Sequence, residues 1–408
     1  MRRLDVRFTR EPGDEFPVGT LAEDAGRIYF EYDAGFLARG LELSPLRLPA
    51  APGLHEHRGA AFGPLPGLFA DSLPDAWGTL LMDRSFRAGG RAPEEVSPLE
   101  RLAWLGTGTM GALTYHPPAD VGEDETGGDA FDLGELCRSA HELLEGKASA
   151  VLPQLLRAGG SPGGARPKVL AGVRGDAIRS GEGDLPEDWD HWIVKFPARS
   201  DDTDAGAVEY AYSLMARAAG LEMPETRLFA AAGGGRFFGA ARFDRRGNRR
   251  FHVHTFAGLI ETDFRVPACD YADLLRAASL LTRNQREVAR AFRLMAFNVL
   301  AHNRDDHAKN FAFLLDDETK EWRLAPAYDL TLAPGPGGEH TMTVAGEGRS
   351  PCAEHMQKLA AGAGIKRRAA AEVIAEVRAA VRRWPEFAEG AGLGREAAGK
   401  VAERLGAG

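Results

Sequence analysis

Apolar residues recur along this 408-residue chain with two different periods, and each period predicts a different element. Within the first 115 residues, an apolar pattern over residues 27–32 predicts a strand, and residues 75–86 have the pattern of a helix. A run rich in proline and glycine, residues 49–67, separates the two. We therefore expect residues 1–115 to form one α+β unit.

The next segment of the chain has almost no apolar positions. Residues 116–130, HPPADVGEDETGGDA, combine proline, glycine and acidic residues, which is the composition of a linker. Beyond it the order of predicted elements is a helix over 133–147, a glycine-rich loop over 158–167, two strands, a second helix and a third strand. The three strands cover residues 168–173, 192–196 and 236–243. Apolar residues at three- and four-residue spacing predict the second helix, which contains Val208, Ala211, Tyr212, Met215 and Ala219.

The rest of the chain has mainly helical periodicity. An apolar face over residues 288–299 predicts a helix that runs directly into the polar segment 302–310. Residues 311–315 and 322–325 flank DDETKE and predict a β-hairpin, and residues 366–384 are again helical. We expect residues 131–245 and 246–408 to form two successive structural regions, the second mainly helical.

Composition narrows the class of protein. The 49 glycines and 24 prolines together exceed the usual share of about 12% and indicate many turns. A formal net charge of −9 argues against a protein that coats nucleic acid by bulk electrostatic attraction. No apolar stretch reaches the length of about 18 residues that a membrane span requires, and no apolar signal segment follows the N-terminal arginines. We expect a cytoplasmic protein without membrane contact.

The three cysteines support the same interpretation. Cys137, Cys269 and Cys352 lie far apart, form no CxxC pair and are odd in number. This pattern is typical neither of a disulfide framework nor of a zinc ribbon, and it favours a reducing compartment.

The densest cluster of reactive side chains is HNRDDHAKNF, residues 302–311. Asp305 is followed five residues later by Asn310, and Asp329 comes after the predicted hairpin. This spacing suits phosphoryl transfer, in which one carboxylate orients the acceptor hydroxyl while an amide oxygen and a second carboxylate hold Mg²⁺. Alternatives for the same run are a solvated loop with capping residues or a transition-metal site, although its spacing matches no zinc pattern. A Ser-His-Asp hydrolase is not indicated because no GxSxG elbow is present.

Lysine is scarce in this chain, since only eight of the 50 basic residues are lysine. Lys168 ends the glycine-rich run GGSPGGARPK, whose backbone N–H groups could cradle phosphate oxygens, although an ordinary loop is also compatible with it. Lys195 lies in the apolar strand WIVKFP, where it either extends to solvent at a sheet edge or points into a nucleotide cleft. Glu209 in the following helix is either the partner of Lys195 or a solvated acid.

Several ordered motifs together resemble the HipA family of bacterial toxin kinases, whose fold is related to protein kinases and phosphatidylinositol kinases. SLPDAWGTLLMDR resembles its N-terminal subdomain, GGARPK its glycine loop and WIVKFP its lysine strand. AARFDR resembles its hinge, HNRDDHAKNF its catalytic loop and PAYDL its metal-binding segment. The resemblance implies an α+β, kinase-like bilobal fold with an N-terminal α+β subdomain and a mainly helical C-terminal lobe.

The resemblance also implies roles for individual residues. Asp305 would be the catalytic base, Asn310 and Asp329 the Mg²⁺ ligands, and Lys195 the lysine on the phosphates of ATP. The loop that covers the nucleotide would include Ser161, which is the matching position for autophosphorylation. The other residues implied in nucleotide binding are Gly163, Gly164, Ala165, Lys168, Ala241, Phe243 and Lys309.

The implied activity is that of an ATP- and Mg²⁺-dependent serine/threonine protein kinase, the toxin of a toxin–antitoxin pair that arrests growth by phosphorylating a cellular protein. The implied partners are a protein substrate and a HipB-like helix-turn-helix antitoxin, with DNA reached only through the antitoxin. A small-molecule phosphotransferase and a catalytically silent co-repressor are the alternatives. Ala241 departs from the glutamate of many relatives, and HVHTFAGLI, residues 252–260, resembles a variant branch of the family.

Overall fold

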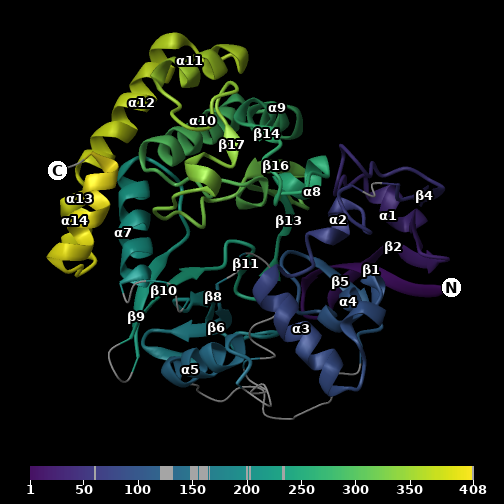
Figure 1. Cartoon of the computed structure of the whole chain (residues 1–408). Helices are drawn as coiled ribbons and strands as arrows, with labels where there is room; N and C mark the ends of the chain where they lie inside the picture. The colour runs from purple at the N-terminus through teal and green to yellow at the C-terminus, as the bar shows by residue number, and fades with distance from the viewer. Residues whose placement is uncertain are drawn as a thin grey trace.

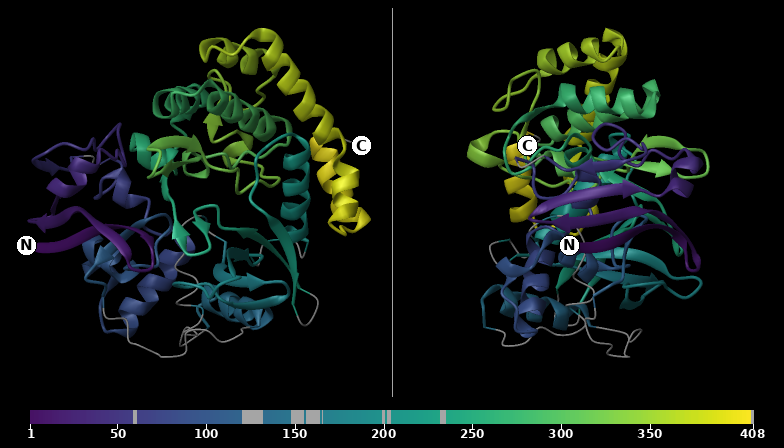
Figure 2. Two further views of the ribbon diagram at one scale, coloured as in Figure 1. Left: turned by 180° about the vertical axis from the view of Figure 1, so that it is seen from behind. Right: turned by 90° about the vertical axis from the view of Figure 1, so that its right-hand side faces the viewer.

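The computed structural model of the chain describes residues 1–58, 61–119, 132–147, 155, 164, 166–198, 201, 204–231 and 235–406. An N-terminal α+β unit, a smaller lobe built on a β-sheet and a larger helical lobe pack together (Figure 1). The N-terminal unit lies beside both lobes, and the view from behind shows the same arrangement (Figure 2).

The N-terminal unit is built on a five-stranded antiparallel sheet in the order β4-β3-β2-β1-β5. Alternate residues of its strands are buried, as a sheet with one covered face requires. The strands are β1 (Arg2–Glu11), β2 (Asp14–Asp24), β3 (Arg27–Tyr32), β4 (Leu54–Glu56) and β5 (Leu113–His116). The helices are α1 (Ala34–Arg39), α2 (Gly67–Ala70), α3 (Ala76–Ala88) and α4 (Pro98–Leu105), with a 3-10 turn η1 (Pro93–Glu95).

The smaller lobe is a second five-stranded antiparallel sheet, in the order β7-β6-β8-β10-β9. Its strands are β6 (Lys168–Arg174), β7 (Ala177–Ser180), β8 (Asp190–Lys195), β9 (Thr226–Ala230) and β10 (Arg236–Ala241). Helix α5 (Leu133–Leu144) covers one face, and helix α7 (Ala205–Ala218) leads towards the helical lobe (Figure 1). Val194 and Phe196 are buried in the core of this lobe, whereas Lys195 points to the opposite face.

The larger lobe surrounds helix α10, whose apolar face is completely buried. The C-terminal helices α12 and α13 pack against α10 and α7, which places the end of the chain beside the junction of the lobes. The helices are α8 (Phe256–Ile260), α9 (Tyr271–Thr282), α10 (Gln285–Leu300), α11 (Ala353–Gly362), α12 (Arg367–Arg382), α13 (Trp384–Gly390) and α14 (Arg395–Leu405), with turns η2 (Ala308–Asn310) and η3 (Pro336–Gly338). The strands are β11 (Arg245–Arg246), β12 (Arg249–Arg250), β13 (His252–Thr255), β14 (Cys269–Asp270), β15 (Ala312–Asp316), β16 (Glu321–Leu324) and β17 (Met342–Thr343).

The hydrophobic cores do not follow the three parts of the sequence. One core extends from the N-terminal sheet through α7 to α10 and α12. A second core belongs to the smaller lobe, yet Trp77 and Leu81 of α3 are part of it. The N-terminal unit is therefore packed into both lobes of the molecule, and its helix α3 contributes to the core of the smaller one.

The predicted elements agree with the structure apart from their ends. The helices predicted over 75–86, 133–147 and 288–299 correspond to α3, α5 and α10, and the predicted hairpin corresponds to β15 and β16. The fold is mixed α+β, as expected. Most of the linker predicted at 116–130 and of the glycine-rich loop at 158–167 lies outside the described residues.

Candidate active site

Two adjoining cavities lie between the lobes and share four charged residues. Lys168, Lys195, Glu209 and Asp329 line both of them. The first cavity is mostly apolar and extends towards strand β10, while the second opens beside the segment that contains Asp305. The shared charges thus mark the boundary between an apolar chamber and a polar one.

Lys195 lies at the centre of this boundary and is bound by two carboxylates. Its Nζ donates to Glu209 Oε1 at 2.5 Å and also forms an ion pair with Asp329. Burial disfavours the charged form of Lys195, but the two carboxylates outweigh burial and raise the pKa of its ammonium above the ordinary value. Glu209 is only 4% exposed, so the structure resolves the sequence alternatives in favour of a paired helix acid and a lysine in the cleft.

Lys168 places a second ammonium beside the first. It is the direct partner of Lys195 on the neighbouring antiparallel strand, so both side chains leave the same face of the sheet. Lys168 is 4% exposed, and burial lowers its pKa to about 8 despite the nearby carboxylates of Asp329 and Asp75. The cleft therefore contains one firmly charged lysine and one that loses its proton easily.

Asp329 occupies a backbone conformation that few residues adopt. Its φ of 54° lies in the left-handed region, which an aspartate tolerates better than most side chains but which still costs energy. Burial opposes its ionisation, yet the ammonium groups of Lys195 and Lys168 hold the pKa of this carboxyl below its ordinary value. The strained turn thus presents a charged carboxylate to both cavities.

The polar segment after helix α10 contains two neighbouring aspartates in opposite environments. Asp305 is exposed and lines the second cavity. Asp306 is completely buried, where it accepts hydrogen bonds from Tyr271 Oη at 2.7 Å and from the backbone N–H of Thr341 at 2.8 Å. His340 Nδ1 lies 2.8 Å from the same carboxylate. Asp306 therefore anchors the segment that presents Asp305, a role the sequence analysis did not assign.

Asn310 supports the same segment from its other end. Its side-chain Nδ2 donates to the backbone oxygen of Asp305 at 2.7 Å, which leaves the amide oxygen available as a ligand. Among the described residues, no group of three or more His, Cys, Asp or Glu side chains could hold a metal ion by itself. A site for Mg²⁺ made of Asn310, Asp329 and ligand phosphates is compatible with this, because Mg²⁺ is usually held by few protein groups.

The glycine-rich loop is described in part. Gly164 donates its backbone N–H to Asp75 Oδ2 at 2.7 Å and lines the second cavity. Ser161, Gly163 and Ala165, the other predicted loop residues, lie outside the described residues. Their predicted roles remain predictions.

The predicted hinge lines the apolar cavity with Ala241 and Phe243. The N–H of Ala241 donates to the carbonyl of Glu225 at 2.8 Å, and that of Arg242 donates to the carbonyl of His191 at 2.8 Å. These two amides are therefore used within the smaller lobe. Phe243 packs its ring against that of Tyr328, with the centroids 5.5 Å apart.

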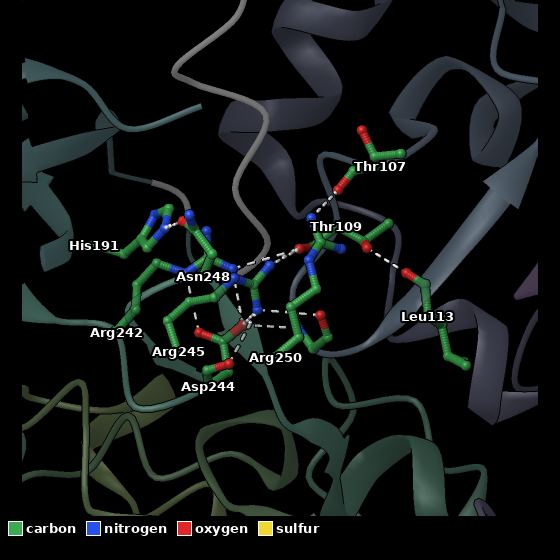
Figure 3. Close-up of polar contacts among 10 residues, drawn as sticks. Thr107, Thr109, Leu113, His191, Arg242, Asp244, Arg245, Asn248 and Arg250 are labelled. Atoms are coloured by element: carbon green, nitrogen blue, oxygen red, sulfur yellow. Dashed lines mark hydrogen bonds and ion pairs between the residues drawn. The ribbon is translucent and has the colours of Figure 1, made fainter. Parts of the chain in front are cut away.

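A buried ionic cluster follows the hinge. Asp244 is fully buried and accepts from Arg242 Nη2 at 2.8 Å and from Arg245 Nη1 at 2.5 Å. Figure 3 shows these side chains gathered together, with Arg250 donating to the carbonyl of Thr107 at 2.6 Å. Because Thr107 belongs to the N-terminal unit, the cluster ties that unit to the hinge. The AARFDR motif indicated a hinge but not this cluster.

Lys309 occupies a different place from the other two cleft lysines. It lines the apolar cavity, and its ammonium forms an ion pair with Asp75 of the N-terminal unit. Its backbone carbonyl accepts from Tyr328 Oη at 2.8 Å. Its predicted contact with the nucleotide remains a prediction.

Two family models match the chain. The HipA-like C-terminal domain matches residues 160–384, more than half of the chain, and the HipA N-terminal domain matches residues 13–116. This chain belongs to the HipA family. Both matches agree with the motifs identified in the sequence, and the first spans the sheet of the smaller lobe together with most of the larger lobe.

The solved structures similar to this chain include a HipA-family protein. HipA in the structure of the Shewanella oneidensis MR-1 toxin–antitoxin system of HipA, HipB and operator DNA matches with a TM-score of 0.73 and 18% identity, over 99% of this chain and 95% of the other. The Helicobacter pylori proinflammatory kinase CtkA matches over 40% of this chain and 53% of its own, at 19% identity and a TM-score of 0.29. No curated protein matches the chain.

Within the described part of this HipA-family chain, none of the helices has the length and apolar character needed to cross a membrane.

Proposed function

We propose that this HipA-family protein is an ATP- and Mg²⁺-dependent serine/threonine protein kinase and the toxin of a toxin–antitoxin pair. The observation that carries the proposal is the arrangement of Lys195 between Glu209 and Asp329, at the boundary of the cavity that Asp305 lines. A phosphotransferase needs cations, a metal-binding carboxylate and a free carboxylate together in this way.

The apolar cavity suits a nucleotide base and the shared charges suit its phosphates. Ile193, Ala240 and Met223 line the apolar end, and Lys195 and Lys168 lie where that cavity meets the polar one. Bound Mg²⁺, held by Asn310 and Asp329, would neutralise charge on the phosphates. With the amides of Ala241 and Arg242 engaged elsewhere, Phe243 is the hinge residue whose main chain we expect to meet the adenine.

The polar cavity is where we expect the phosphate acceptor, a substrate hydroxyl, to bind. Asp305 is exposed there, so its carboxylate can accept a hydrogen bond from the hydroxyl of a substrate serine or threonine and take its proton. Asp306 and Asn310 hold the segment on either side of it, which fixes where that carboxylate stands. Positioning and charge stabilisation then supply most of the catalysis.

We extend the proposal to regulation and partners on the strength of the family. Ser161 is the expected autophosphorylation site, because a phosphate there adds about two negative charges to a loop that must approach ATP. A HipB-like helix-turn-helix antitoxin is the expected partner, and DNA would be contacted through it. The Shewanella HipA structure holds HipB and operator DNA, which supports this assignment.

Labelling with radioactive ATP and Mg²⁺ tests the proposal. We expect wild-type protein to label a protein in a cell lysate and Asp305→Asn to lose this labelling by about 10²-fold or more, because a general base contributes about that factor. The variant should bind ATP as the wild type does, since Asp305 is exposed and none of the described contacts ties its carboxylate to the nucleotide end.

The outcomes separate the alternatives. Phosphorylation of a metabolite with no labelled protein would identify a small-molecule phosphotransferase. If neither the wild type nor Asp305→Asn binds or turns over ATP, the kinase proposal is wrong. In cells, growth arrest by the wild type should disappear with Asp329→Ala.

A further inference from the structure

We propose that Asp75 of the N-terminal unit is a positioning residue of the active site, holding the backbone at Gly164 and the catalytic-loop Lys309 together. This inference rests on the proposed kinase function but makes a separate claim. It assigns to the N-terminal unit a direct part in ordering the nucleotide site.

The contacts of Asp75 join three distant parts of the chain. Its Oδ2 accepts the Gly164 N–H at 2.7 Å, and its Oδ1 pairs with the ammonium of Lys309, 234 residues away. The side chains of Asp75 and Lys309 are 11% and 12% exposed, so the pair is well shielded from solvent. A carboxylate with a charged donor in such surroundings forms strong, orienting hydrogen bonds.

Asp75 does not perform the role its position in the chain predicts. It is the N-cap residue of α3, where an aspartate normally accepts hydrogen bonds from the first backbone N–H groups of the helix. Here its side chain makes no capping bond and turns to Gly164 and Lys309 instead. Giving up a cap of about 1 kcal/mol is the kind of departure from local rules found at functional sites.

Trp77, two residues after Asp75, fixes the start of helix α3. Trp77 is 1% exposed, and its Nε1 donates to the carbonyl of Lys168 at 2.9 Å. Helix α3 is thus fixed to Lys168, the first residue of β6, which directly follows the glycine-rich loop. Lys309 Nζ lies 5.2 Å from the centre of the Phe264 ring, and Phe264 lines the polar cavity. Asp75 therefore connects the loop side and the catalytic side of the cleft.

Nucleotide affinity and hydrogen exchange test the proposal in the full-length protein. With Asp75→Ala we expect the dissociation constant for ATP·Mg²⁺ to rise about tenfold or more, since two charge-assisted bonds are lost. Asp75→Asn, which keeps an acceptor for Gly164 but loses the charge, should be intermediate. Calorimetry on these variants in an Asp305→Asn background measures binding without turnover, and exchange of the peptide containing Gly164 should accelerate without nucleotide.

The matched control is Asp83→Asn. Asp83 lies on the same helix and pairs with Arg101 inside the N-terminal unit, away from the cleft. It should leave both ATP affinity and the exchange of Gly164 unchanged. In the steady state, the Asp75 variants should raise KM for ATP more than they lower kcat, which a general loss of folded protein does not do.

Each outcome decides the question. If the parent protein binds ATP and the Asp75 variants bind it equally well, the positioning role is wrong. If the Asp305→Asn parent with an intact Asp75 binds no ATP, the kinase proposal is wrong. In that case hydrogen exchange still tests the positioning role, which is wrong if the Asp75 variants leave the exchange at Gly164 unchanged. If Asp75→Ala does not fold, the isosteric Asp75→Asn is used for the test. A double-mutant cycle then combines Asp75→Asn with Lys309→Met, and we expect the losses of ATP affinity in the two single variants not to add in the double variant.

Discussion

At the scale of the residue, the two lysines of the cleft differ in what balances their charge. Lys195 has two carboxylate partners within hydrogen-bonding distance, so it stays protonated. Lys168 is buried beside it, but the nearby carboxylates offset burial less than they do for Lys195. Burial therefore lowers the pKa of Lys168 from 10.5 to about 8. The same residue type therefore titrates differently at adjacent positions of one sheet face.

This difference predicts a pH dependence of nucleotide binding. Phosphates require the charged form of Lys168, which is lost as the pH rises through about 8. We expect the dissociation constant for ATP to increase between about pH 7 and pH 9, and proton uptake to accompany binding in the upper part of that range, measured by calorimetry in two buffers.

Lys168→Arg is the control for that prediction, because arginine stays protonated across this range. It should remove the pH dependence near 8, and a persistent dependence would assign the titration to another group. The lowered pKa of Lys168 also defines how its contribution to stability changes with pH. The unfolded chain binds more protons than the folded one between about pH 8 and 10.5, so the contribution of Lys168 to the free energy of unfolding rises across that window.

At the scale of the element, close backbone packing between short helices attaches the N-terminal unit to the larger lobe. Helix α2 begins at Gly67, where an added Cβ would lie 1.9 Å from the carbonyl oxygen of Gly258 in α8. The N–H of Gly67 donates to Glu261 Oε1 at 3.0 Å. Asp71, at the end of α2, accepts from the N–H of Thr255 at 2.6 Å. Only glycine permits this approach.

Gly67→Ala should therefore destabilise the protein. We expect the free energy of unfolding to fall by about 1–3 kcal/mol, the usual cost of overpacking, because the obstructing atom is backbone. The matched control is Gly399→Ala within α14, where an added Cβ meets nothing within 4 Å. It should stabilise by about 0.5–1 kcal/mol. Equal effects of the two substitutions in denaturant unfolding would contradict the packing argument.

At the scale of the whole molecule, the buried ionic cluster after the hinge joins all three parts. Asp244 binds two arginines and also accepts the N–H of Gly111 at 2.8 Å, while Arg245 donates to the carbonyl of Thr109 at 3.1 Å. Figure 3 shows Thr107 and Thr109 of the N-terminal unit beside these groups. The N-terminal unit is thus attached at the point where the two lobes meet.

Removing the carboxylate of Asp244 should be costly. Asp244→Asn leaves buried guanidinium groups without their anion, so we expect a loss of about 3–5 kcal/mol in the free energy of unfolding. Burial opposes ionisation of Asp244, but Arg242 and Arg245 hold its pKa well below the ordinary value of 3.8. Its stabilisation is therefore present above about pH 4 and declines as the pH falls further, and the variant should lack that decline.

Asp263→Asn is the control for the cluster, because it breaks an exposed ion pair with Arg265. It should change the free energy of unfolding by about 0–1 kcal/mol. A small effect of Asp244→Asn, equal to that of the control, would show that the cluster does not hold the parts together.

Local patterns in the sequence were sufficient for several of the helices and strands and for the order of the motifs. The period of apolar residues predicted α10 and the hairpin of β15 and β16, because a side chain's direction depends on the period of its own element. Asp305 and Asn310 could be predicted to belong to one site for the same reason, because they lie only five residues apart in the sequence. The pairing of Glu209 with Lys195 was left open, since strand and helix periods do not say how the two elements face each other.

The amino-acid sequence by itself determined the α+β class, the HipA-like succession of motifs and the residue types from which the site is made. Only the tertiary structure decided which side chains meet. It brought Asp75 to Lys309 over 234 positions and Gly111 to Asp244 over 133. Such contacts depend on how sheets and helices pack against one another, which short-range periodicity does not encode, and so the N-cap residue of α3 contacts Gly164 and Lys309 instead of capping its helix.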